Sequence, residues 1–248
     1  MGTDNVVHIE QSDGSCDECS HQQVCLTRGW VPDEIKKLEP NVRRGKPLPR
    51  GELLYRQGER LRALYILRSG ALKSFLSTAD GLEQVVRFHL PGAILGLDGL
   101  GDDHYASSAQ AIVASSVCRL PSELINSSIE KFPVLRMRIL RLAGREAALG
   151  HERAILLTQR AAEERLASFL IEMSEQYGQR GFSPREFNLP MSRQDISSYL
   201  SLAVETVSRM FTGFQNAGLI EVDRRSVRLL DMGELRAMAH GGRLAAAN

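Results

Sequence analysis

Long apolar segments and an excess of one charge are both absent from this 248-residue sequence. No segment approaches the roughly 20 apolar residues that a membrane-spanning helix needs, and the N-terminus lacks the basic region and apolar run of a secretion signal. The 31 basic and 30 acidic residues give a net charge of +1, so any affinity for nucleic acid must come from the local placement of charge. We therefore expect a cytoplasmic protein that does not associate with a membrane.

Patterns that carry catalysis are also missing. The six histidines show neither the spacing of a metal site nor a pairing with a nucleophile. No glycine-rich loop of the phosphate-binding type occurs in the sequence. We therefore expect that the protein is not an enzyme.

Cysteine is scarce, and its distribution is uneven. Cys16, Cys19 and Cys25 lie within ten residues of one another, and Cys118 is the only other cysteine. In a reducing compartment this favours metal binding or redox chemistry over disulfides. The spacing leaves an iron–sulfur cluster and structural zinc open, although zinc more often uses two close pairs. A Cys-x-x-Cys redox enzyme would need a βαβ unit that is absent here, and an inert, buried Cys118 is a further alternative.

The chain divides into four predicted parts. Residues 1–30 form a polar tail and the cysteine loop, and residues 31–130 contain β-rich runs separated by glycines about every ten residues, which favours an antiparallel β-roll. Residues 131–159 show helical periodicity, and residues 160–248 contain two helical segments followed by a hairpin. The predicted fold class is α+β, with an N-terminal β-roll, a long helix and a C-terminal winged helix-turn-helix.

Leucines recur every seven residues along the predicted long helix. Such a stripe predicts that two helices pair as a parallel coiled coil, and we interpret residues 131–159 as a dimerisation helix. The alternative is that the same leucines pack against the chain's own domains, because core helices also have apolar faces. The predicted dimerisation residues are Leu135, Ile139, Leu142, Leu149 and Leu156.

The last part of the chain has the pattern of a helix pair that binds DNA. Ser192 is a suitable N-cap for a first helix, and residues 203–217 repeat helical spacing up to Gly218, which is a favourable residue for ending a helix. We expect the second of these helices to be the recognition helix, followed by a hairpin that turns at residues 223–225.

Four side chains in the first turns of that helix are candidates for reading bases. Glu205 and Arg209 lie four residues apart, with Thr206 and Ser208 beside them. In the major groove, arginine matches the acceptors of guanine, and a carboxylate can accept from the cytosine amino group. The alternative is a solvated Glu–Arg ion pair without function.

At this point the sequence resembles the family of the cyclic-AMP receptor protein and the fumarate and nitrate reduction regulator. Residues 204–209 match the Glu-x-x-Ser-Arg signature of the second group, and the match continues through residues 162–166 and 180–187. The resemblance implies a homodimer that reads TTGAT-like half-sites of an inverted repeat in double-stranded DNA, about 34–36 Å apart. It also implies contact with RNA polymerase, for which the turn at residues 80–83 is a candidate.

The same resemblance assigns a cofactor. In the fumarate and nitrate reduction regulator four cysteines at this spacing ligate a [4Fe–4S] cluster, which implies that Cys16, Cys19, Cys25 and Cys118 are the ligands here. It further implies that the dimer with its cluster controls genes of anaerobic metabolism. Oxygen would convert the cluster to [2Fe–2S] or remove it, and DNA would be released.

The glycine framework of the predicted roll is similar to a cyclic-nucleotide-binding jelly roll, but the nucleotide site is not. A cyclic phosphate needs a buried cation or oriented amides, yet no arginine occurs between Arg87 and Arg119. We therefore predict that the roll does not bind a cyclic nucleotide. A roll that controls an activity other than DNA binding is the rival interpretation, and the winged segment argues against it.

Overall fold

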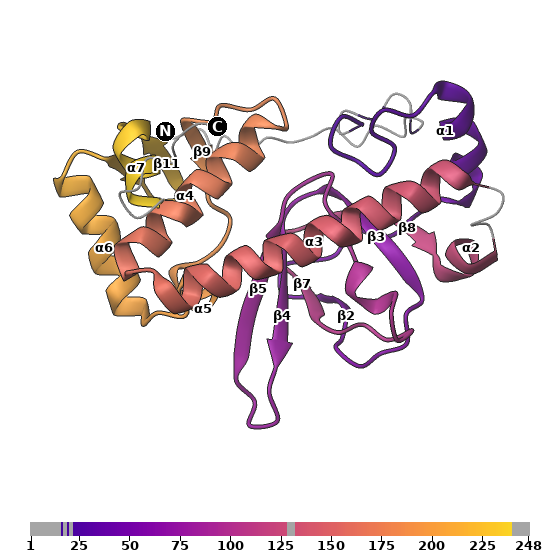
Figure 1. Ribbon diagram of the computed structural model, residues 1–248, viewed down its shortest axis with the longest axis horizontal. Helices are drawn as coiled ribbons and strands as arrows, with labels where there is room; N and C mark the ends of the chain where they lie inside the picture. Colours follow the sequence, from indigo (N-terminus) through magenta and orange to yellow (C-terminus); the bar gives the residue numbers. More distant parts are fainter. Residues whose placement is uncertain (1–15, 17–18, 20–21, 128–131, 240–248) are drawn as a thin grey trace.

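The computed structural model describes residues 16, 19, 22–127 and 132–239. Outside the described residues lie the predicted tail at residues 1–15 and also Lys131 and residues 240–248. A β-roll and a C-terminal helical half are connected by the long helix α3 (Pro133–Gln159), which crosses the molecule diagonally (Figure 1). None of the helices within the described ranges is both long and apolar enough to cross a membrane.

Two four-stranded antiparallel sheets form the roll, in the orders β1-β8-β3-β6 and β2-β7-β4-β5. Gly70 occupies a turn with φ +86°, where a Cβ would lie 2.4 Å from the carbonyl oxygen of Ala114, so a tight turn depends on glycine here. The predicted antiparallel roll is confirmed. Its strands are β1 (Arg43–Arg44), β2 (Leu53–Tyr55), β3 (Ala63–Ser69), β4 (Leu72–Ser77), β5 (Glu83–His89), β6 (Ile94–Leu95), β7 (Ser108–Ala111) and β8 (Ser116–Pro121).

Short helices cover the end of the roll at which the cysteine loop lies. α1 (Pro32–Leu38) continues into a 3-10 turn at Glu39–Asn41, and α2 (Ser122–Ser127) follows β8 directly. A second 3-10 turn spans Leu97–Gly99. The N-terminal half of α3 packs beside these elements, so the roll, the loop and α3 share one apolar cluster.

The C-terminal half is a winged helix-turn-helix, as predicted. Ser192 caps α5, because its Oγ accepts from the amide of Asp195 at 3.0 Å, and the left-handed Ser201 then turns the chain into the recognition helix. Gly218, with φ +68°, follows that helix. The elements are α4 (Ala162–Gly178), β9 (Glu186–Asn188), α5 (Arg193–Leu200), α6 (Val204–Asn216), β10 (Ile220–Asp223), β11 (Ser226–Leu229) and α7 (Met232–Ala239).

Polar contacts join the helix-turn-helix to the roll. Lys73 Nζ on β4 forms an ion pair with Asp195 on α5 at 2.8 Å, and both side chains are largely buried. The amide of Val85 donates to Ser198 Oγ at 2.9 Å. Arg153 on α3 reaches both halves, since it donates to the carbonyl of Val85 at 3.0 Å and its guanidinium lies 3.8 Å from the ring centre of Tyr199. The apolar core is continuous across this junction.

Candidate functional site

The four cysteines meet at one end of the roll. All are free thiols, and Cys118 lies on β8, paired with Arg44 of β1 and Ile66 of β3. Cys16, Cys25 and Cys118 each pack against the apolar cluster that contains the inner face of α3. Residues distant in sequence are thus brought to the same place, as the cysteine prediction requires.

Burial and neighbouring charge both raise the pKa of three of the thiols. Burial raises the pKa of Cys16 to about 12, and the charges of Glu39, Cys118, Cys25 and Cys19 add to the rise. Burial is also the main cause of the raised pKa of Cys25 and of Cys118. A metal centre would stabilise these three sulfurs as thiolates against the effect of burial.

The described residues do not, however, form a completed metal cage. Among them, no group of three or more histidine, cysteine, aspartate or glutamate side chains is arranged to hold a metal ion. Residues 17, 18, 20 and 21 of the loop lie outside the described part of the chain. The assignment of the four cysteines as ligands therefore stays a prediction.

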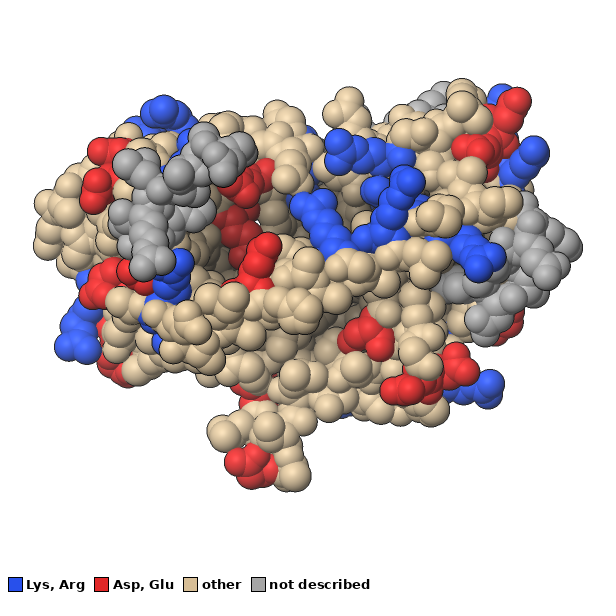
Figure 2. Space-filling model, viewed as in Figure 1, with Lys and Arg blue, Asp and Glu red and all other residues tan. Residues whose placement is uncertain are grey.

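Arginines surround the cysteine site on two sides. Arg68 and Arg44 act to lower the pKa of Cys118, against the larger effect of burial. On the opposite side, Arg138 Nη2 on α3 donates to the main-chain oxygen of Cys25 at 3.3 Å. Figure 2 shows basic side chains gathered beside α3 on this face. Positive charge at this position favours an anionic set of thiolates.

The loop reaches the roll through a close approach at Gly92. Gly92 has φ +89°, and a Cβ there would lie 2.3 Å from Cγ2 of Val24, one residue before Cys25. The turn at Pro91-Gly92 thus positions the cysteine loop through backbone that only glycine provides without strain.

We expect Gly92→Ala to displace the loop. The matched control is Gly81→Ala, because Gly81 has a similar φ of +83° but nothing within 4 Å of the added Cβ. Both variants pay the left-handed strain of about 1–2 kcal/mol, whereas only Gly92→Ala should also speed hydrogen exchange at the amides of Cys25 and Arg28. Equal loop exchange in the two variants would contradict the proposed role of this contact.

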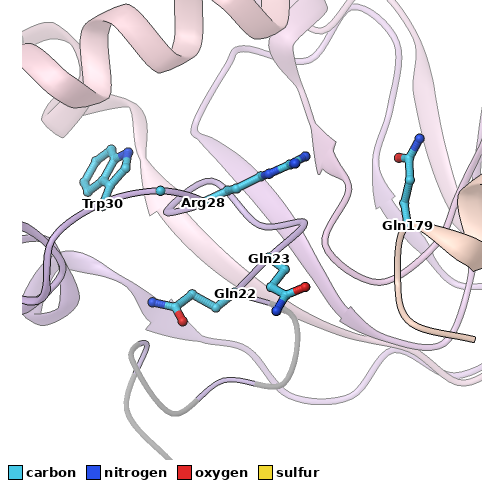
Figure 3. Close-up of a pocket in the computed structure, with 6 residues that line it drawn as sticks. Gln22, Gln23, Arg28, Trp30 and Gln179 are labelled. Carbon is cyan, nitrogen blue, oxygen red and sulfur yellow. The ribbon is translucent and has the colours of Figure 1, made fainter.

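A shallow cavity of about 520 Å³ borders the loop. In Figure 3 the side chain of Arg28 extends away from Trp30 along this cavity, and Gln179 approaches from the C-terminal half. The lining residues are Gln22, Gln23, Arg28, Gly29, Trp30 and Gln179. Because most of these side chains are at the surface, we assign no ligand to the cavity.

The recognition helix presents the predicted base-reading side chains to solvent. Glu205, Ser208 and Arg209 are exposed and Thr206 is half-buried, whereas the opposite face is buried in the core of the C-terminal half. Ser208 Oγ donates to the carbonyl of Val204 at 2.9 Å. The structure describes both Glu205 and Arg209 and records no ion pair between them, so their ends are available to a partner.

The predicted dimerisation residues do not share a free surface. Leu135 and Ile139 are only 1% and 7% exposed and belong to the same apolar cluster as Leu26 and Trp30 of the cysteine loop segment, so they face the chain's own core, and a role in dimerisation stays a prediction. Leu142 is half-buried against the same cluster. Leu149 and Leu156 are also half-buried. The alternative that the leucines pack within the chain describes the N-terminal half of α3 correctly.

A different face of α3 is apolar and exposed, and the sequence interpretation missed it. Met137, Leu140 and Ile155 are 48%, 55% and 50% exposed. Gly144 and Ala147 lie between them at helical spacing and are exposed too. The i, i+3, i+7 spacing could have indicated this stripe, but its small residues made the signal weaker than that of the leucines.

Aromatic side chains fill part of the interior of the roll. Tyr55 and Tyr105 stack with ring centres 3.9 Å apart, and Tyr105 Oη donates to the carbonyl of Ala63 at 2.8 Å. Asp98 accepts from Ser107 Oγ at 2.7 Å, which places a carboxylate in this region. An anion would be repelled by that carboxylate.

Comparisons with known proteins agree with this architecture. Residues 46–132 match the model of the cyclic nucleotide-binding domain, and residues 164–238 match that of the Crp-like helix-turn-helix domain. The chain is 43% identical to the transcriptional activator protein anr of Pseudomonas aeruginosa, over 91% of this chain and 93% of the relative. It is 39% identical to the fumarate and nitrate reduction regulatory protein of Escherichia coli, over 90% of each.

Among solved structures, FixK2 from Bradyrhizobium japonicum is similar, with a TM-score of 0.74 and 27% identity, over 83% of this chain and 99% of that one. These relatives are transcription regulators and not enzymes, which confirms the non-enzyme prediction. The chain therefore belongs to the family of the cyclic-AMP receptor protein and the fumarate and nitrate reduction regulator, and within it to the type of the latter.

Proposed function

We propose that this protein is an oxygen-responsive, cytoplasmic transcription regulator. In the absence of oxygen, a [4Fe–4S] cluster on Cys16, Cys19, Cys25 and Cys118 supports a homodimer that binds inverted repeats of TTGAT-like half-sites. The dimer controls genes of anaerobic metabolism. The observation that carries the proposal is the convergence of Cys118 with the cysteine loop on the inner face of the helix whose outer face is apolar and exposed.

The residues fit such a cofactor. Cys16, Cys25 and Cys118 pack against one apolar cluster, and Arg44, Arg68 and Arg138 lie near them to offset negative charge. When bound by Cys16, Cys19, Cys25 and Cys118, the cluster would supply an oxygen-labile link among the four cysteines. Structural zinc is the other candidate for this donor set.

The protein's own residues provide the route from the site to dimerisation. Cys25 directly precedes Leu26 in the loop. Leu26 and Trp30 belong to the same apolar cluster as Leu135 and Ile139 of α3. A change in the position of the loop would alter its packing on the inner face of α3. The position of Met137 and Leu140 on the outer face would change with it. Parallel pairing of two α3 helices would bury this stripe.

We expect Leu140→Glu to weaken dimerisation strongly, because it places a carboxylate at the centre of the proposed interface. Sedimentation velocity of the anaerobic, cluster-loaded protein should show a dimer dissociation constant raised by about 100-fold, the effect of about 2.7 kcal/mol. The control is Leu82→Glu on the β4–β5 hairpin, since Leu82 is 67% exposed and lies away from α3. Equal weakening in both variants would contradict the assignment of the interface.

DNA would be read by α6. Arg209 would donate to guanine and Glu205 would accept from a cytosine amino group, with Ser208 and Thr206 contributing further contacts. Two α6 helices related by the dimer axis would enter successive major grooves.

Contact with RNA polymerase is proposed for the β4–β5 hairpin, which projects from the roll (Figure 1). Thr78 donates to Asp80 and holds the turn, and Leu82 is exposed beside it. An exposed leucine on an ordered turn suits a protein partner, although hairpin turns of this kind are common. The filled roll supports the further proposal that no cyclic nucleotide is bound.

The domain limits remain predictions as well. Residues 1–30, 31–130, 131–159 and 160–248 are proposed as tail and cysteine loop, roll, dimerisation helix and DNA-binding domain. Arg160 is extended between α3 and α4, which supports the last limit.

The experiment that tests the cofactor is an anaerobic preparation assayed for iron, acid-labile sulfide and zinc, with its visible spectrum. We expect about four iron and four sulfide per chain, the composition of one [4Fe–4S] cluster. Zinc without sulfide would contradict the cluster and leave the DNA-binding proposal intact.

A further inference from the structure

One side chain joins the cysteine loop directly to α3. Arg138 Nη2 donates to the main-chain oxygen of Cys25 at 3.3 Å, across 113 residues of sequence. Around this hydrogen bond, Leu26 and Trp30 of the loop pack with Leu135 and Ile139 of the helix. The contact is therefore part of the surface on which the loop rests.

We infer that Arg138 is a positioning residue that couples the cysteine loop to the dimerisation face of α3. This inference rests on the proposed function, because it assigns the element through which the state of the cysteines reaches the dimer interface. Arg138 touches the backbone of Cys25 and not its thiol. It can thus follow the position of the loop without competing for a ligand site.

The position of Arg138 on α3 suits this role. The residue is half-buried, with Leu135 and Leu142 on the side that faces the roll and Met137 on the exposed apolar stripe. A helix transmits a displacement along its length because its backbone is internally hydrogen-bonded. A shift of the Cys25 carbonyl would therefore move the turn that carries Met137 and Leu140.

Within the described part of the chain, the surroundings of Arg138 contain like charges and an unpartnered buried nitrogen. Burial lowers the pKa of Arg138, and the nearby positive charges of Arg28, Arg141 and Arg145 lower it further. Arg28 belongs to the loop, whereas Arg141 and Arg145 belong to α3. The charge of Arg28 therefore opposes the packing of the loop on α3, which the hydrogen bond and the apolar contacts favour. In addition, Nε of Arg138 is buried and has no hydrogen-bond partner among the described atoms.

A purely structural role for Arg138 predicts something different. If the side chain only stabilised α3 or the fold, its replacement would weaken dimers equally with and without a loaded cysteine site. A coupling role predicts that the replacement changes the ratio of the two dimer dissociation constants.

The test uses full-length Arg138→Gln, with Arg136→Gln as the matched control, which removes the same charge from an exposed position on the same helix without a recorded side-chain hydrogen bond to the loop. Hydrogen exchange is measured first on metal-free protein. We expect the amides of Cys25, Arg28 and Trp30 to exchange about tenfold faster in Arg138→Gln, the loss of one charge-assisted hydrogen bond, and to be unchanged in Arg136→Gln. Equal exchange in both variants overturns the inference, whether or not the protein proves to bind a cluster.

Dimer dissociation constants are then measured for cluster-loaded and metal-free protein. Arg138→Gln should reduce the loaded-to-free ratio about tenfold and leave the metal-free constant unchanged, and Arg138→Lys, which keeps a charged donor, should restore part of the ratio. An unchanged ratio overturns the coupling role. If wild-type dimerisation itself does not respond to loading, the proposed function fails, and the exchange experiment still decides whether Arg138 holds the loop. If Arg138→Gln does not fold, Arg138→Lys decides by the same two measurements.

Discussion

Cys118→Ser protein prepared without oxygen should contain almost no iron and should remain monomeric. Cys118 is the one proposed ligand that lies on the sheet, so its loss leaves the loop cysteines without an anchor on β8. Serine is close to cysteine in size but brings a hydroxyl to a position beside the apolar cluster, so the metal-free variant should melt only about 2–4 °C below metal-free wild type. Iron and sulfide assays with sedimentation velocity measure the effect.

The control for this substitution is Ser116→Ala, two residues earlier on the same strand, where the hydroxyl bonds to Ser69 Oγ at 2.6 Å and not to the cysteine site. We expect that variant to load normally. Full iron content in Cys118→Ser protein would show that the fourth ligand has been assigned wrongly.

Arg209→Ala should weaken binding to a TTGAT-type operator by about 10- to 100-fold, the value of one good base contact. Arg236→Ala is the matched control, because it removes one exposed positive charge from α7 of the same domain. Electrophoretic mobility shift or fluorescence anisotropy at fixed salt gives both constants.

A second measurement uses an operator in which one base pair is changed. Replacing the G·C pair of each half-site should weaken wild-type binding strongly, whereas Arg209→Ala protein should no longer distinguish the two operators. Retained discrimination in Arg209→Ala protein would mean that another side chain reads that base pair.

The winged helix-turn-helix was predictable because its signals are local. The capping of α5 by Ser192, the helical spacing up to Gly218 and the hairpin turn each depend on a few adjacent residues. The antiparallel roll was predictable from its glycines for the same reason. Conformations that adjacent residues dictate leave a pattern in the sequence.

The orientation of α3 was not predictable in this way. The helix has two apolar faces, and periodicity alone does not say which of them faces the chain's own core. The larger residues, Leu135 and Ile139, fill that core, whereas the outer stripe contains Gly144 and Ala147 between Met137 and Ile155. A leucine stripe was therefore interpreted as an interface although part of it is interior.

The cysteine site was predictable in part. Spacing identified the four residues but left cluster and zinc open, since both accept four thiolates. The contacts that connect the site to the rest of the molecule, Arg138 with Cys25 and Gly92 with Val24, join residues far apart in the chain. Such contacts depend on the tertiary fold, so no local pattern indicates them.

The central claim is that the state of the four cysteines controls binding to DNA. Its most direct test is the affinity of a single anaerobic preparation for an inverted-repeat operator, measured before exposure to air, after exposure and after anaerobic reconstitution with iron and sulfide. We expect the anaerobic protein to bind the operator tightly as a dimer. Binding should be lost in air together with a shift to monomer, and binding should return on reconstitution. Binding that stays the same through all three stages would contradict it.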